Sequence, residues 1–131
     1  AVVSWLLAGL AEQAAEAQAQ EELRRREATL ADRPTPRGTV LLTGGTGIAR
    51  RDQTYETVTS LLTKPLPGYG ELFRMLSYQE IGAAAMLSRA TGGLMGRTVV
   101  LTMPGSPAAV RLAMDKVILP ELGHLVREAQ R

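Results

Sequence analysis

Hydrophobic and polar positions divide the chain into a helical amino-terminal part and a longer part in which strands and helices alternate. Over residues 2–31, an apolar stripe near the 3.6-residue period is followed by Ala, Gln, Glu and Arg, which predicts helix throughout. Residues 32–38 contain two prolines, which remove amide donors and disfavour helix before them. We therefore expect residues 32–38 to connect the two parts.

Short apolar runs after this connector predict strands at residues 39–43, 85–91 and 98–103. Helices are predicted at residues 53–62, 71–75, 78–84 and 108–118, and in a last segment that starts at Pro120. The glycines of residues 92–96 predict a turn between the second and third strands. Strands that alternate with helices indicate an α/β fold with a mainly parallel sheet, and the length of 131 residues predicts a single domain.

Composition narrows the class of protein. The net charge of +2 is too small to indicate a nucleic-acid partner, and basic residues are not interleaved with aromatic ones. The basic run at residues 24–26 has acidic neighbours, which is typical of a solvated helix face. Aromatic residues make up only 4% of the chain, so aliphatic side chains and the five methionines are expected to fill the core.

The chain has no cysteine and one histidine, His124, which is expected on the surface of the last helix. Disulfides, thiolate zinc sites and a cysteine nucleophile are therefore excluded, and we expect neither zinc nor haem. Residues 1–10 are apolar but only about half as long as a membrane span, and no basic residue precedes them as in a signal peptide. We expect a cytoplasmic protein without a membrane partner.

A glycine-rich loop directly follows the first predicted strand and consists of Thr43, Gly44, Gly45, Thr46 and Gly47. Glycines let the backbone turn sharply and approach a ligand, so that its amides can bind an anion, and the threonine hydroxyls add donors. No Lys-Ser/Thr pair follows as in a P-loop, and the spacing differs from the dinucleotide-binding motif. Two interpretations remain: a phosphate-binding loop, or a tight turn without a ligand.

Charged residues follow this loop. Asp52 can hold Mg²⁺, which prefers one or two carboxylates together with phosphate oxygens, or it can cap the helix predicted from residue 53. Arg50 and Arg51 can neutralise phosphate or be solvated. Arg51 is the better candidate because it adjoins Asp52.

Polar residues also mark two later segments. Ser88 and Arg89 interrupt the apolar run at residues 85–91, where a ligand, a neighbouring subunit or backbone carbonyls must satisfy them. The turn after residues 98–103 contains Pro104, Gly105 and Ser106. Ligands of open α/β sheets bind beyond the carboxyl ends of strands, so this turn and the glycine loop are predicted to line one crevice. Glu71 is either a helix-start acid or a further site residue.

These motifs, in this order and spacing, resemble the MoaB/MogA family of molybdenum-cofactor biosynthesis proteins from residue 39 to the carboxyl terminus. The matching segments are residues 43–47, 51–52, 67–71, 87–89 and 103–107, and residues 71–82 resemble the MoaB branch in particular. The resemblance implies a three-layer α/β/α sandwich that binds molybdopterin and assembles as a trimer or hexamer.

The resemblance further implies adenylylation of molybdopterin with Mg-ATP, because active relatives catalyse this reaction and release pyrophosphate. On this basis the glycine loop holds phosphate, Asp52 positions Mg²⁺ and the reacting phosphates, and Ser88 and Ser106 contact the pterin. Two functions follow: an enzyme of adenylyl transfer, or a non-catalytic oligomer that binds or scaffolds the pterin.

Residues 1–38 depart from the family pattern. Family members begin with a strand, an Asp-Thr/Ser-Gly segment, a helix, a second strand and an acidic loop. Residues 1–38 contain neither predicted strand nor a counterpart of the second family acid. Loss of two strands would leave one side of the sheet without partners. We therefore expect that residues of the family domain are absent from this sequence, the alternative being a truncated protein.

Overall fold

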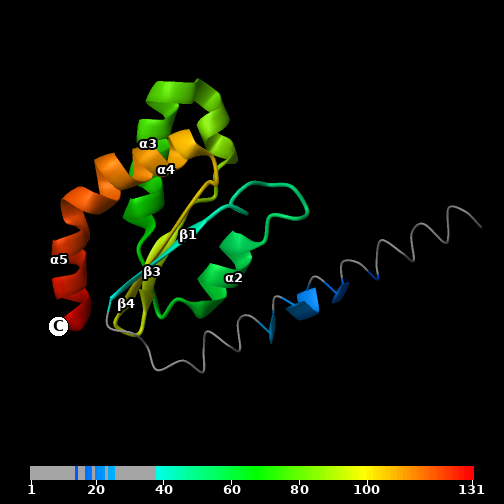
Figure 1. Cartoon of the computed structure of the whole chain (residues 1–131), viewed down its shortest axis with the longest axis horizontal. Coiled ribbons are helices and arrows are strands. Elements are labelled where there is room, and N and C mark those ends of the chain that lie inside the picture. The colour runs from blue at the N-terminus through cyan, green and yellow to red at the C-terminus, as the bar shows by residue number, and fades with distance from the viewer. Residues whose placement is uncertain (1–13, 15–16, 19, 23, 26–37) are drawn as a thin grey trace, which may run out of the picture. The chain divides into compact units, whose positions relative to one another are not determined.

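The computed structural model describes residues 38–131 together with residues 14, 17, 18, 20–22, 24 and 25 (Figure 1). The chain divides into two units, Ala1–Pro34 and Thr35–Arg131. In the first unit the described residues are helical and exposed, and Arg25 Nε lies 3.7 Å from Glu21 Oε1. A solvated helix is thus confirmed at these positions. The predictions for the other residues of 1–37, including the connector, lie outside the described residues, and a single domain stays a prediction.

The second unit contains a four-stranded sheet in the order β1–β4–β3–β2. Strand β1 (Thr39–Thr43) pairs in parallel with β4 (Thr98–Met103). Strand β3 (Gly92–Met95) pairs antiparallel with β4 and with the two-residue strand β2 (Lys64–Pro65). The strands predicted at residues 39–43 and 98–103 are therefore confirmed.

Strand β3 differs from the prediction of a turn at residues 92–96. Gly92 and Gly93 lie where a Cβ would collide with atoms of the neighbouring strands, so these glycines mark a close approach of backbones within the sheet. Only Gly96 and Arg97 separate β3 from β4, and so short a connection joins antiparallel strands. The described sheet has one parallel and two antiparallel strand pairs, and a mainly parallel sheet is not confirmed.

The strand predicted at residues 85–91 is wrong. Residues Gly82–Leu87 form a 3₁₀ helix, η1, and residues 88–91 are irregular before β3 begins. The run is rich in alanine and has no β-branched residue before Thr91, so it has little preference for a strand. Gly82, with a φ of 68°, ends the preceding helix and redirects the chain.

Two helices lie between β1 and η1. Helix α2 (Thr54–Leu61) confirms the prediction at residues 53–62, and α3 (Pro67–Ile81) is continuous where the sequence predicts two short helices. Pro67 is the first residue of α3, where its fixed φ suits a helix and its missing amide has no intrahelical partner to lose. Glu71 therefore lies in the second turn of α3, and its interpretation as a helix-start acid is wrong.

One continuous helical segment follows β4. It consists of α4 (Pro107–Leu112), the π-helical η2 (Ala113–Ile118) and α5 (Leu119–Gln130). The predicted helix at residues 108–118 and the start of the last helix near Pro120 are confirmed, but no break separates them. In a regular α-helix the ring of Pro120 would clash with the carbonyl of Lys116, four residues earlier. The wider turns of η2 contain Lys116 and allow the helix to continue.

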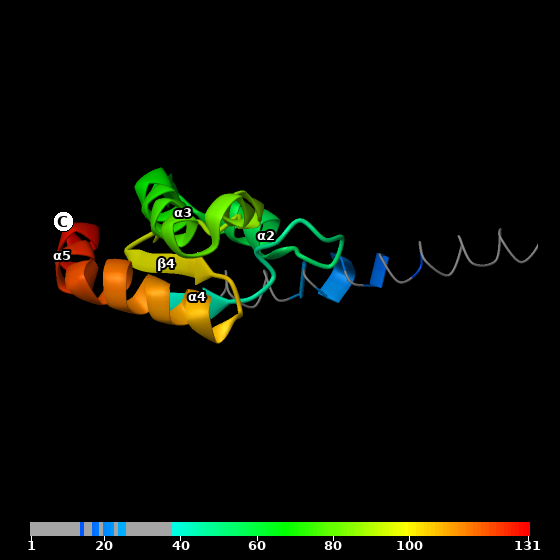
Figure 2. The same cartoon turned by 90° about the horizontal axis from the view of Figure 1, so that it is seen from above.

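The sheet lies between two helical layers. Figure 2 shows α2 and α3 on one side of β4 and α4 on the other, with α5 beside the end of the strand. Strand β4 is buried along its whole length. The core around it includes Tyr69, Phe73, Val99, Leu101, Met103, Leu112 and Ile118. This is the three-layer α/β/α arrangement that the family resemblance implies.

The methionines fill less of the core than expected. Met103 is buried, whereas Met75 is 52% exposed and Met86 is 74% exposed. The buried face of α3 carries Tyr69 and Phe73, and Met75 lies on the opposite face of the same helix. The prediction of core methionines is therefore wrong for Met75 and Met86.

The surface of α5 agrees with one further expectation. His124 is exposed on α5, with Nδ1 3.0 Å from Glu121 Oε2, as predicted for a surface histidine. None of the helices in the described part of the chain has both the length and the apolar character of a membrane span. A cytoplasmic location stays a prediction.

Candidate functional site

Two loops meet at one edge of the sheet. Because β1 and β4 are parallel neighbours, the glycine loop and the turn after β4 leave the sheet at the same edge. The Gly44 amide donates to the Met103 carbonyl at 2.9 Å, and a Cβ on Gly105 would lie 3.4 Å from Gly44 Cα. We call the residues of both loops the paired loops: Thr43, Gly44, Gly45, Thr46, Gly47, Pro104, Gly105 and Ser106.

Thr54, the first residue of α2, holds the glycine loop against that helix. Its amide donates to the Gly45 carbonyl at 3.0 Å, and its Oγ1 donates to the Gly44 carbonyl at 2.7 Å. Gly45 has a φ of 67°, and a Cβ there would collide with the Thr54 side chain, so only glycine fits. Sequence reasoning missed Thr54, although its position at the helix start behind the loop was a usable signal.

The carboxylate of Asp52 lies beside the glycine loop. Its Oδ2 accepts a hydrogen bond from the Ala49 amide at 3.0 Å, and a Cβ on Gly47 would lie 2.7 Å from the same oxygen. The Asp52 amide donates to the Ala49 carbonyl at 2.9 Å, which closes the turn. The N-cap of α2 is Gln53, without a side-chain cap bond. The interpretation of Asp52 as a helix cap is therefore wrong.

Arg89 reaches the glycine loop from the irregular segment after η1. Its amide donates to the Thr46 carbonyl at 2.7 Å, and its Nε donates to the Gly47 carbonyl at 2.9 Å. Its Nη2 donates to the Asp52 carbonyl at 3.0 Å. The structure thus places Arg89 against the loop, as the sequence predicts, with backbone carbonyls as its partners.

Two neighbours on α2 complete the surroundings of Arg89, and sequence reasoning predicted neither. Glu56 forms an ion pair with the guanidinium, in which Nη2 lies 3.3 Å from Oε2. The hydrogen bond from Arg89 lowers the pKa of Glu56 below its ordinary value, so the carboxylate stays charged at neutral pH. The guanidinium carbon lies 5.3 Å from the centre of the Tyr55 ring, in cation–π contact.

A second arginine holds the segment of Ser88 from the side of α3. Arg74 Nη1 donates to the Ala90 carbonyl at 2.9 Å and, more weakly, to the Ser88 carbonyl at 3.4 Å. The Ser88 hydroxyl accepts a hydrogen bond from the Ala90 amide at 3.3 Å. These bonds satisfy the polar groups that the sequence leaves without partners, and they need no ligand to do so.

The remaining predicted residues are more exposed. Ser106 is the N-cap of α4, and its Oγ accepts a hydrogen bond from the Ala109 amide at 3.2 Å. Arg51 and Glu71 are exposed, and neither forms a hydrogen bond or ion pair with another described residue that would tie it to the paired loops. Contact of Ser88, Ser106, Arg51 or Glu71 with a ligand stays a prediction.

Three successive amides of the glycine loop have no acceptor in the part of the chain that the structure describes. The amide of Gly44 is used by Met103, but within the described residues the amides of Gly45, Thr46 and Gly47 donate no hydrogen bond to the protein. Backbone donors without partners are rare where the chain is shielded from water, and Thr46 is only 2% exposed. Adjacent amides of this kind form binding sites for anions such as phosphate.

One carboxylate, that of Asp52, lies beside these amides. Among the described residues there is no group of three or more His, Cys, Asp and Glu side chains that could hold a metal ion without help. Magnesium differs from zinc in this respect, because one or two carboxylates suffice when phosphate oxygens and water supply its other ligands. The arrangement therefore fits Mg²⁺ that arrives with a phosphate ligand.

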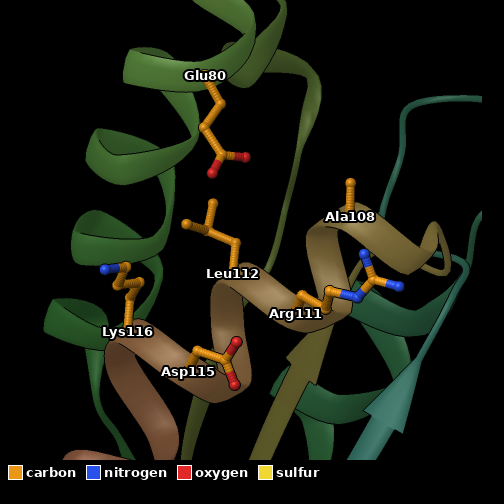
Figure 3. A pocket seen from close by; sticks show the side chains of 6 residues that line it. All are labelled: Glu80, Ala108, Arg111, Leu112, Asp115 and Lys116. Atoms are coloured by element: carbon orange, nitrogen blue, oxygen red, sulfur yellow. The ribbon is translucent and has the colours of Figure 1, made fainter.

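A surface cavity of about 240 Å³ lies elsewhere, between α3 and the α4–η2 segment. Figure 3 shows Glu80 of α3 directed towards Leu112, with Lys116 and Asp115 below. The cavity is lined by Glu80, Ala108, Arg111, Leu112, Asp115 and Lys116. None of the residues predicted from the sequence to bind a ligand belongs to this lining, so the cavity is separate from the paired loops.

Comparison with known proteins places the chain among molybdopterin-binding domains. The family described as "Probable molybdopterin binding domain" matches residues 4–124. Over 93 residues the chain is 62% identical to molybdenum cofactor biosynthesis protein B of Bacillus cereus and 60% identical to that of Bacillus subtilis. These matches cover 70% of this chain, but the chain spans only 55% of the length of these relatives.

Solved structures agree with this result. A crystal structure of molybdenum cofactor biosynthesis protein B has a TM-score of 0.74 and 54% identity, over 85% of this chain and 69% of that chain. The tungsten cofactor synthesizing protein MoaB from Pyrococcus furiosus has a TM-score of 0.67 and 42% identity, over 71% of this chain and 59% of that chain. The fold, the ordered motifs and the matches agree, and the chain belongs to the MoaB/MogA family of molybdopterin-binding domains of molybdenum cofactor biosynthesis.

Proposed function

We propose that this protein binds the phosphate end of molybdopterin at the paired loops and adenylylates it with Mg-ATP. The observation that carries the proposal is the set of adjacent amides at Gly45, Thr46 and Gly47 that have no acceptor among the described residues. They lie at the carboxyl edge of parallel strands, where α/β proteins bind phosphate ligands. The family match supports the pterin as the ligand that carries this phosphate.

In the proposed reaction a phosphate oxygen of molybdopterin forms a bond to the α-phosphorus of ATP, and the bond to pyrophosphate breaks. Phosphoryl chemistry of this kind depends on positioning and on neutralisation of charge more than on covalent help from the protein. The loop amides hold the phosphate. The carboxylate of Asp52, oriented by the Ala49 amide, would hold Mg²⁺, which would supply positive charge to offset that of the phosphates.

A direct assay tests this proposal. The protein is incubated with molybdopterin and Mg-ATP, and adenylylated pterin and pyrophosphate are measured. Asp52→Asn is expected to abolish turnover and to leave pterin binding largely intact, because the amide keeps the shape of the side chain but loses its charge. Asp115→Asn, an exposed aspartate on η2 away from the paired loops, is the matched control and should react like the unaltered protein. Normal turnover of Asp52→Asn would remove Asp52 from the mechanism.

The alternative function is a non-catalytic oligomer that binds or scaffolds the pterin. It is supported by the lack, among the described residues, of a group of three or more His, Cys, Asp and Glu side chains that could hold a metal ion. It is also supported by the 55% coverage of the curated relatives. Binding of molybdopterin at full occupancy without formation of pyrophosphate would establish this alternative and refute the enzyme.

We propose further that the protein assembles as a homo-oligomer, a trimer or hexamer, through the outer face of α3 and η1. Large apolar side chains there are 49–74% exposed, although isolated globular proteins rarely expose a contiguous group of this kind. The residues are Leu72, Met75, Tyr78, Ile81, Met86 and Leu87. Light scattering should give a trimer or hexamer that Met75→Glu dissociates and the control Ser60→Glu does not. A monomeric unaltered protein would refute this proposal.

A further inference from the structure

The side chain of Arg89 joins two backbone carbonyls of the loop region to a carboxylate on α2. Its Nε donates to the Gly47 carbonyl and its Nη2 to the Asp52 carbonyl, at 2.9 and 3.0 Å. Nη1 and Nη2 bind the carboxylate of Glu56 on α2. The Arg89 amide also donates to the Thr46 carbonyl, at 2.7 Å. Few residues of the described chain make so many separate contacts with one loop.

These contacts determine the direction of the loop amides. In a planar trans peptide the C=O and N–H bonds point in opposite directions. When the backbone amide of Arg89 holds the Thr46 carbonyl, the amide of Gly47 must therefore point away from Arg89. When the guanidinium holds the Gly47 carbonyl, the amide of Ile48 does the same. Neither amide has a protein acceptor among the described residues, so both donors are presented on the open side of the loop.

The guanidinium itself is poorly placed to bind phosphate. All three of its nitrogens already bind protein oxygens, and its side chain is only 28% exposed. Glu56 balances its charge, and Tyr55 lies against one face. A paired charge attracts an incoming anion much less than a free one. The planar fork of arginine is instead well suited to several fixed acceptors at once.

We propose that Arg89 is a positioning residue, whose guanidinium fixes the end of the glycine loop and aims the Ile48 amide at the phosphate, beside the amides of Gly45, Thr46 and Gly47, without touching the ligand. This inference rests on the proposed function and refines the sequence prediction that Arg89 binds phosphate or pterin. A direct contact needs mainly a positive charge, which lysine retains. Positioning needs the fork of three nitrogens, which lysine lacks.

The test compares Arg89→Lys, Arg89→Gln and Glu56→Gln in the full chain, with Arg111→Lys on α4 as the matched control. Binding of molybdopterin is expected to weaken by about tenfold or more in both Arg89 variants, because charged hydrogen bonds to the loop are lost. In Glu56→Gln, binding should weaken by a smaller factor because the guanidinium loses one anchor. Near-normal binding by Arg89→Lys, or tighter binding by Glu56→Gln, would indicate direct phosphate contact and overturn the proposal.

Hydrogen exchange of the ligand-free protein provides a readout that is independent of the proposed function. In Arg89→Lys, the hydrogen-bonded amides of Ala49 and Asp52 should exchange about tenfold faster or more, while those of β4 keep their rates. Unchanged exchange at Ala49 and Asp52 overturns the positioning role. Equal acceleration in β4 also overturns it, because it would indicate general destabilisation. If the unaltered protein does not bind molybdopterin, the proposed function fails and the exchange result alone decides the role of Arg89.

Discussion

The phenol of Tyr69 connects α3 to the central strand, and its replacement should change stability in opposite directions at neutral and alkaline pH. Tyr69 is 4% exposed, and its hydroxyl donates to the Thr102 carbonyl at 2.8 Å. In Tyr69→Phe the ring still fills the core, but the hydrogen bond is lost. We expect the free energy of unfolding at pH 7 to fall by about 1 kcal/mol, the usual net value of such a bond.

The alkaline effect follows from the burial of the same group. Burial raises the pKa of Tyr69 from 10.0 to about 12. A group whose pKa is raised in the folded state contributes stability below the unfolded value, and this contribution is lost as pH rises from 10 towards 12. The loss amounts to about 1.4 kcal/mol at pH 11 and about 2.3 kcal/mol at pH 12. Phenylalanine has no proton to lose, so Tyr69→Phe should become the more stable protein above a crossing point near pH 10.7.

Urea unfolding followed by circular dichroism at pH 7, 9, 10, 11 and 11.5 measures this difference. Other groups titrate in the same range, but they do so in both proteins and cancel in the comparison. Tyr78→Phe is the matched control, because Tyr78 lies on the same helix, its hydroxyl forms no hydrogen bond with a described residue, and phenylalanine keeps its ring on the proposed oligomer face. That variant should follow the unaltered protein at every pH. A difference between Tyr69→Phe and the unaltered protein that stays constant from pH 7 to 11.5 would refute the assignment of a raised pKa to the buried phenol.

Three further substitutions test the packing around the paired loops and the core. Gly45→Ala is expected to lower the free energy of unfolding by more than about 1–2 kcal/mol, because the left-handed φ and the collision with Thr54 act together. Thermal melting measures this loss, and an unchanged melting temperature would contradict it. Gly68→Ala should instead raise stability by about 0.5–1 kcal/mol, since this helical position has no atom within 4 Å of the added Cβ, and a lower melting temperature would argue against it. Phe73→Ala removes a ring that is 1% exposed and should cost about 3–5 kcal/mol in urea unfolding, whereas a loss below about 1 kcal/mol would mean that the core collapses around the gap.

A sequence prediction is accurate where the residues that determine an element lie within or next to that element in the sequence. Strands β1 and β4 were predictable to the residue because β-branched and aliphatic runs end at a glycine or proline loop. The structure of residues 85–91 could not be predicted in this way, because Ala, Met and Leu occur in several backbone conformations. The change of chain direction at Gly82 determines which conformation forms. The glycines of β3 indicate a turn when read alone, and only the neighbouring strands reveal that they allow close packing.

The same distinction between local and distant signals applies to the candidate site. The paired loops follow from strand ends, which are visible in the sequence. Sequence reasoning did not find Thr54, Glu56 and Arg74, because each of them binds a group that is distant in the sequence. Glu56 and Arg89, for example, are 33 positions apart. No periodicity or spacing rule relates such pairs. The interpretation of Asp52 as a helix cap failed for a local reason, since its partner is the Ala49 amide in the turn before it and not the helix after it.

The pairing of β1 with β4 has a consequence for the order in which the molecule folds. The hairpin of β3 and β4 closes over two residues, whereas β1 must bring Thr39 to Val99 before any of its bonds can form. Closing so large a chain segment is entropically slow, and contacts between distant residues form late. The glycine loop directly follows β1, and it acquires its shape only when β1 docks as the last strand to pair. Affinity for phosphate should therefore appear at the end of refolding, after the helical signal has recovered, and it would serve as a marker of molecules that have completed the fold.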